Sequence, residues 1–133
     1  MNRKAWKLVL NGKSLSQGYY TNINFFHTVD YSNSLGKTIR PHLGKLFCFS
    51  TKEHLLIFLG DNYSENDYLQ NLQIIYGTAY NVGYPKQMCV KTRDYQDFWK
   101  IKEQKKRMYL ETFVPPEGTI TCSSFRVEEI ITL

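Results

Sequence analysis

The sequence predicts an α+β fold: a mainly antiparallel sheet of five to seven strands, with one principal helix over about residues 51–59 packed on it. Two observations predict this fold. Short β-prone runs recur between turn signals, and a capped helix start directly follows a buried apolar run. The chain has 133 residues, 42% of them hydrophobic and 22% charged, which fits a single domain over residues 1–133.

The first predicted elements are two strands joined by a tight turn. Residues 5–10 alternate weakly and end at Asn11-Gly12, a dipeptide typical of two-residue hairpins, so residues 13–20 are predicted to return as the second strand. Residues 21–33 mix Asn, Phe and His without a clean period. They predict a loop, with a short strand or helical turn around residues 25–31.

The principal helix is predicted because an apolar, strand-like run is followed directly by a helix-capping sequence. Leu46 to Phe49 is a short apolar run entered from Gly44, as is typical of a central strand. Ser50-Thr51-Lys52-Glu53 then has the spacing of a capping box, in which the first side chain bonds an orphan amide and Glu53 reaches back. The helix is predicted to end at Gly60-Asp61-Asn62 and to carry an apolar face of Leu55, Leu56, Phe58 and Leu59.

The middle of the chain predicts a second hairpin and a second helix. Residues 72–80 are rich in Ile and Tyr, and residues 87–92 alternate, so the two runs are predicted to pair across the break at Gly83-Tyr84-Pro85. A second helix is predicted within residues 94–109, where the apolar period is poor.

Two closing strands are predicted over residues 119–122 and 125–133, after the turn Pro115-Pro116-Glu117-Gly118. Glu128 and Glu129 are adjacent in the second of these strands. Strand alternation would point them to opposite faces, so we do not expect them to form one catalytic pair.

Composition favours anionic partners and a cytoplasmic location. The formal net charge is +5, which selects anions in general and none in particular. No apolar run approaches the roughly 20 residues needed to span a bilayer, and Met1-Asn2-Arg3-Lys4 leads into no apolar signal core, so no membrane contact is expected. Cys48, Cys89 and Cys122 lack any CxxC spacing and are expected to be small buried hydrophobes, with no metal and no cofactor.

A basic turn bounded by glycines is the candidate ligand-binding segment. Lys37, Arg40, His42 and Lys45 lie within nine residues, close to glycines that let a ligand approach the backbone. The guanidinium of Arg40 can hold a phosphate through two hydrogen bonds, whereas lysines act as point charges. The other interpretation of this segment is an ordinary exposed turn. Further candidate binding residues are Tyr84, Lys91 and Arg93.

The ten tyrosines and eight phenylalanines offer surfaces on which bases can stack, or they simply pack the core. The sequence contains fewer features that indicate an enzyme, because the histidines lack metal-ligand spacing and no nucleophile elbow or Walker loop occurs. His42 remains a candidate general acid or base on a phosphodiester. The basic run over residues 100–107 would serve nucleic acid, although a solvated helix face is the simpler interpretation.

The chain resembles a loose group of small phage and prophage accessory proteins. The group pattern has a short N-terminal strand that begins near a tyrosine or tryptophan, then a Tyr-x-x-Gly-Lys-x-x-x-Pro segment. After it come a glycine, an apolar strand, a Thr-x-Glu helix start and a late Pro-x-Gly-Thr strand. The matching residues here are Trp6, Tyr31, Gly36-Lys37, Pro41, Gly44, Leu46 to Phe49, Ser50-Thr51-Lys52-Glu53, Pro116-Glu117-Gly118-Thr119 and Val127. Tyr31 lies five residues from Gly36, where the pattern has three, and residues 71–110 have no counterpart.

Several compact phage proteins of this size bind and sequester nucleotide immune signals of the host. Together with the basic turn and the excess of tyrosine, the resemblance implies a non-enzymatic protein that binds and sequesters an anionic, nucleotide-like host signal. Whether the binding site forms within one subunit or between the subunits of a homo-oligomer stays open. Two alternatives stay open. One is an enzyme that cleaves a phosphodiester in a cyclic nucleotide signal, and the other is an inhibitor that binds a host protein or nucleic acid directly.

Overall fold

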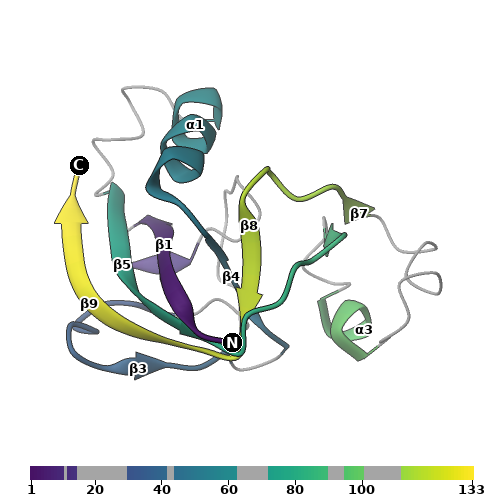
Figure 1. Cartoon of the computed structure of the whole chain (residues 1–133), viewed down its shortest axis with the longest axis horizontal. Coiled ribbons are helices and arrows are strands. Elements are labelled where there is room, and N and C mark those ends of the chain that lie inside the picture. The colour runs from purple at the N-terminus through teal and green to yellow at the C-terminus, as the bar shows by residue number, and fades with distance from the viewer. Residues whose placement is uncertain (11, 15–29, 42–43, 63–71, 90–94, 101–111) are drawn as a thin grey trace.

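The computed structural model describes residues 1–10, 12–14, 30–41, 44–62, 72–89, 95–100 and 112–133 (Figure 1). Its elements are labelled as in Figure 1. They are β1 (Arg3–Leu10), β2 (Lys13–Ser14), β3 (Thr38–Ile39), β4 (Leu46–Phe49), α1 (Lys52–Asn62), β5 (Leu72–Tyr80), β6 (Met88–Cys89), α3 (Tyr95–Lys100), β7 (Thr112–Phe113), β8 (Thr119–Cys122) and β9 (Ser124–Thr132).

The main sheet is antiparallel throughout, with the strand order β3-β9-β5-β1-β4-β8. It has seven strands when the two-residue β2, which pairs with β1, is counted. The sheet curls into a half-barrel in which the long strands β1, β5 and β9 lie side by side (Figure 1). The predicted antiparallel α+β architecture is confirmed at this level.

The two faces of the sheet differ in burial. Residues at alternate positions of β1, Ala5 and Val9, lie on the face that forms the main apolar cluster, together with Ile75, Phe125 and other side chains that are at most 4% exposed. We call this the closed face. The opposite side carries Trp6 and is called the open face, because several of its side chains remain accessible to solvent.

Helix α1 shares a second apolar cluster with the open side of the sheet. Leu55 and Leu59 of the helix belong to the same buried cluster as Leu8, Phe49 and Ile74. The spacing i, i+4 puts these two leucines on one helix face. Leu56, predicted to share that apolar face, is 44% exposed instead.

The helix begins one residue later than the predicted capping box implies. The hydroxyl oxygen of Thr51 accepts the backbone N–H of His54 at 3.1 Å, which makes Thr51, not Ser50, the residue that caps the helix. Glu53 is exposed in the first turn. The helix also includes the predicted stop signal itself and ends at Asn62, beyond the predicted span of about residues 51–59.

The second predicted hairpin is wrong in its pairing. β5 pairs along its length with β1 and β9, whereas β6 pairs with β7 in a separate two-stranded sheet. The first hairpin is confirmed for β1 and β2, in the register Leu10↔Lys13, and residues 15–20 lie outside the described chain. Of the second predicted helix, only α3 is described.

A third apolar cluster joins α3 to β4 and β6. Phe47, Met88 and Phe98 are buried together, and the indole of Trp99 packs against them, 5.5 Å from the ring of Phe47 between centroids. No helix in the described part of the chain is long and apolar enough to cross a membrane.

Candidate functional site

A β-bulge in β9 reshapes the open face. Tyr76 of β5 pairs with Glu129, but the next pair is Gly77 with Val127, so Glu128 is an extra residue without a partner of its own in the strand register. Residues opposite each other in an antiparallel pair share a face. Glu129 therefore lies on the face of Tyr76, and Glu128 contacts Thr78 on that same face. The expectation that Glu128 and Glu129 point to opposite faces is wrong, because it assumed unbroken alternation.

The strand register lines up two rows of side chains across this face. One row runs Thr38, Arg126, Thr78 and Lys4, across β3, β9, β5 and β1. The neighbouring row runs Glu129, Tyr76, Trp6 and Phe49, across β9, β5, β1 and β4. The first row is polar and basic and the second carries aromatic rings, so cations and π-faces are brought next to each other. We call the accessible members of these rows, with Glu128, the open-face patch; they are Lys4, Trp6, Thr38, Tyr76, Thr78, Arg126, Glu128 and Glu129.

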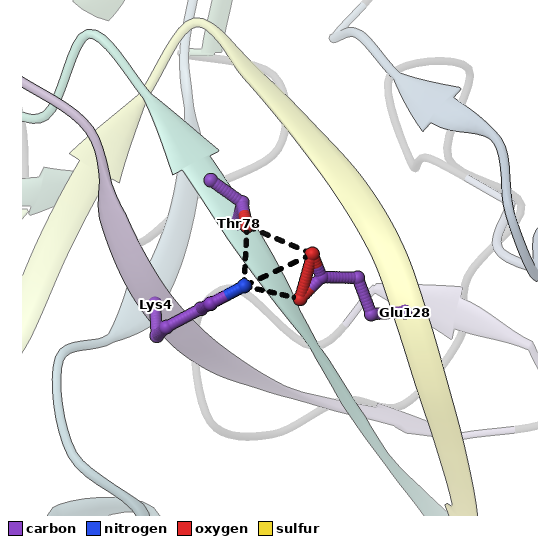
Figure 2. A network of polar contacts seen from close by, with 3 residues as sticks. All are labelled: Lys4, Thr78 and Glu128. Atoms are coloured by element: carbon purple, nitrogen blue, oxygen red, sulfur yellow. Dashed lines mark hydrogen bonds and ion pairs between the residues drawn. The ribbon is translucent and has the colours of Figure 1, made fainter.

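A polar network of three strands crosses the patch. Figure 2 shows Lys4, Thr78 and Glu128 pointing toward one another from β1, β5 and β9. The ammonium of Lys4 donates to both carboxylate oxygens of Glu128, at 2.7 and 3.1 Å, and to the hydroxyl oxygen of Thr78 at 3.1 Å. Thr78 in turn donates to Glu128 at 3.0 Å. The hydrogen bond from Lys4 lowers the pKa of Glu128 and raises the pKa of Lys4.

Two aromatic rings lie beside this network. The rings of Trp6 and Tyr76 are 5.0 Å apart between centroids and tilted by 43°, and the ammonium of Lys4 lies 5.8 Å from the centroid of the Tyr76 ring. Both aromatic residues are half-buried. Arg126 is exposed and close enough to Glu128 to favour the ionised carboxylate, which lowers the pKa of that group further. The patch therefore offers a partly exposed stacking surface with cations at its side.

The structure separates the residues of the predicted basic turn. Lys37 and Arg40 are exposed and flank β3 at one end of the strand order, whereas Lys45 is exposed next to β4. Tyr84 is 64% exposed and follows the bridge from Gly83 to Thr121, beside β8 at the other end of that order. His42, Lys91 and Arg93 lie outside the described residues.

Both glycines that bound the basic turn have structural contacts. The amide of Gly36 donates to the carbonyl of Val127 at 2.9 Å, so that donor is already used by β9. Gly44 has φ +68°, and any Cβ there would collide with the indole of Trp99. Of the predicted residues, Lys37 directly precedes Thr38 of the open-face patch, and Arg40 lies two residues after it.

A buried lysine on the closed face was not predicted from the sequence. Lys7 is 3% exposed, its ammonium donates to the backbone carbonyl of Phe47, and it lies 5.9 Å from the centroid of the Tyr31 ring. Burial lowers the pKa of Lys7. β1 and β4 share a single paired position, Trp6 with Phe49, so the lysine supplies a hydrogen bond where the backbone ladder does not continue. The sequence signal that could have indicated this burial is the position of Lys7 midway between Ala5 and Val9, because residues two apart along a strand share a face.

The cysteines are confirmed as buried small residues where the structure describes them. Cys48 and Cys122 are free thiols, 3% and 0% exposed, on the paired strands β4 and β8. The hydrogen bond that Cys48 shares with Cys122, together with burial, raises the pKa of the Cys48 thiol well above its ordinary value. A buried thiol with a raised pKa is a poor nucleophile.

A hydroxyl, an imidazole and a carboxylate meet at the start of α1. The hydroxyl oxygen of Thr51 lies 2.7 Å from Nδ1 of His54, and Nε2 of His54 lies 3.8 Å from Glu117. The same Thr51 oxygen also holds the first turn of the helix through the His54 amide. Helix capping therefore accounts for these contacts. Among the described residues, no group of three or more His, Cys, Asp or Glu side chains is placed to hold a metal ion.

Comparisons with protein-family models, with curated proteins and with solved structures find no match for the chain. The resemblance to small phage proteins stays a prediction.

Proposed function

We propose that this protein binds an anionic, nucleotide-like ligand on the open-face patch and releases it unaltered. The observation that carries the proposal is the Trp6–Tyr76 ring pair, 5.0 Å between centroids, with the ammonium of Lys4 close to one ring. Partly exposed aromatic rings on a sheet are surfaces on which bases stack, and stacking contributes about 1–3 kcal/mol per base.

The charges around the rings favour a ligand that carries phosphate. Arg126 is exposed in the row next to the rings, and Thr38, opposite Arg126 on β3, leads to the exposed Arg40. A guanidinium binds phosphate in a bidentate geometry that lysine cannot provide. Lys4 is already paired with Glu128, so Arg126 is the cation best placed to meet an incoming phosphate.

Binding without reaction is the simpler role for these groups. The carboxylate of Glu128 accepts hydrogen bonds from Lys4 and Thr78, and its lowered pKa makes it a weak general base at neutral pH. The resemblance to phage accessory proteins would make the ligand a host immune signal that the protein sequesters.

The proposal is tested by calorimetric titration of the purified protein with nucleoside monophosphates, cyclic dinucleotides and ADP-ribose derivatives. We expect at least one of them to bind, and Arg126→Gln to weaken that binding about tenfold, as loss of one phosphate contact implies. The matched control is Lys86→Gln, which removes an exposed positive charge between β5 and β6. Equal effects of the two variants, or no binding by any compound, would contradict the proposal.

The same titration separates the alternatives. Chromatography of the heat-released ligand distinguishes binding from cleavage, because an altered product would favour the phosphodiester-cleaving enzyme. Binding of polynucleotides that weakens steeply with salt would favour a nucleic-acid-binding protein, since counterion release scales with the number of phosphates contacted.

A further inference from the structure

We infer that the open-face patch selects guanine among the bases, with the carboxylate of Glu129 as the group that recognises it. The inference rests on the proposed function and adds the chemical class of its ligand. It starts from the bulge in β9, which puts Glu129 opposite Tyr76, at the end of the row that contains the Trp6 ring.

Glu129 is the available one of the two neighbouring carboxylates. Glu128 is held by Lys4 and Thr78 through three hydrogen bonds. Glu129 is exposed, and within the described chain its side chain forms no hydrogen bond or ion pair. A base stacked on Tyr76 or Trp6 would therefore bring its edge to a carboxylate with free acceptor positions.

The hydrogen-bonding pattern of the bases then decides which one fits. A carboxylate only accepts hydrogen bonds, and its two oxygens suit two parallel donors. Guanine has adjacent donors at N1 and N2 on one edge. Adenine places the acceptor N1 beside its amino group, cytosine likewise pairs an amino donor with an acceptor, and the lone donor of uracil lies between two carbonyl oxygens. Each of these would direct a lone pair toward the carboxylate.

The cations fit the same orientation of the ligand. Arg126 lies three residues before Glu129 on β9, in the neighbouring row. Because Glu128 is the extra residue of the bulge, these three residues span only two positions of the strand register. Side chains two positions apart along a strand are separated by about 7 Å. A guanine edge at Glu129 therefore leaves the sugar and phosphate free to extend toward Arg126.

The test compares guanosine, inosine and adenosine monophosphates by calorimetric titration against the wild type and Glu129→Gln. For the wild type we expect guanosine monophosphate to bind about tenfold more tightly than adenosine monophosphate, with inosine monophosphate between them because it lacks the N2 amino group. Glu129→Gln should reduce the preference to within about twofold, since the amide turns a donor toward the base. Glu53→Gln, at an exposed glutamate of α1, is the matched control and should keep the preference.

The outcomes separate this inference from the proposed function. Equal binding of the three nucleotides would overturn guanine selection while leaving nucleotide binding in place. A guanine preference that survives Glu129→Gln would overturn the role of this carboxylate. If none of the three nucleotides binds, guanine selection is overturned, whereas binding of another member of the wider panel would still support the proposed function.

Discussion

Gly77 allows β5 and β9 to pair at the point where the bulge begins, and its replacement by alanine tests that role. A Cβ at position 77 would lie 2.9 Å from the backbone carbonyl carbon of Arg126 and closer still to its oxygen, whereas ordinary contacts begin at 3.4 Å. The obstacle is the backbone of a neighbouring strand, which cannot rotate aside as a side chain can. Gly77→Ala should therefore force β5 and β9 apart beside Glu128.

The size of the effect follows from the overpacking at Gly77 and from the hydrogen bonds between β5 and β9 that it disturbs. Overpacking costs about 1–3 kcal/mol, and each ladder hydrogen bond disturbed costs about 1 kcal/mol more. We expect the free energy of unfolding to fall by about 3 kcal/mol, a large part of the roughly 5–15 kcal/mol that stabilises a domain. In urea denaturation this lowers the midpoint by roughly 2 M at the slope usual for small proteins.

The matched control is Gly60→Ala in α1, where a Cβ would meet nothing within 4 Å. There alanine should stabilise the protein by up to about 1 kcal/mol, because glycine has the lower helix propensity. A Gly77→Ala variant within about 0.5 kcal/mol of the wild type, on the order of the usual scatter for surface changes, would refute the reasoning.

Three further predictions concern the described contacts. Burial lowers the pKa of Lys7, so between this lowered pKa and the ordinary value of 10.5 the unfolded chain binds more protons than the folded one. Stability should therefore rise with pH over that interval, and Lys7→Met should abolish the rise in a pH series of urea denaturations. Thr51→Ala should cost about 1 kcal/mol and Ser50→Ala much less, by the same assay, because Thr51 caps α1. The hydrogen bond from Lys4 lowers the pKa of Glu128 below 4.5, so the contribution of this carboxylate to stability is present above that value and is lost as the pH falls through the folded pKa. Glu128→Gln should remove this loss of stability at acid pH, and an unchanged pH profile would contradict the prediction.

The local secondary structure could be predicted from the sequence. Short-range patterns predicted the pairing of β1 with β2, the strand Leu46–Phe49 and the helix after Ser50, because turn dihedrals, apolar runs and caps act over a few residues. Even there the cap shifted by one residue. Thr51 and Ser50 are both suitable capping residues. Which of them accepts the hydrogen bond from the His54 amide depends on where the chain leaves β4.

Strand pairing could not be predicted in the same way. Local pattern predicts that the run over residues 72–80 forms a hairpin with its sequence neighbour, yet this run pairs with β1 and β9 at the centre of the sheet. Local propensity does not identify partners that are far apart in sequence. The bulge at Glu128 has a similar origin, because Gly77, on a different strand, provides the close approach beside it.

The candidate site was decided by tertiary structure. Taken alone, the sequence determined the antiparallel α+β class, the basic charge and the abundance of aromatic residues, since these depend on composition and on short-range pattern. From the sequence, the predicted binding site is a turn in which Lys37, Arg40 and Lys45 are close along the chain. Only the register of β1, β5 and β9 brings Lys4, Trp6, Tyr76 and Glu129 onto one face, because a sheet places residues side by side according to their hydrogen-bonded partners and not their separation along the chain.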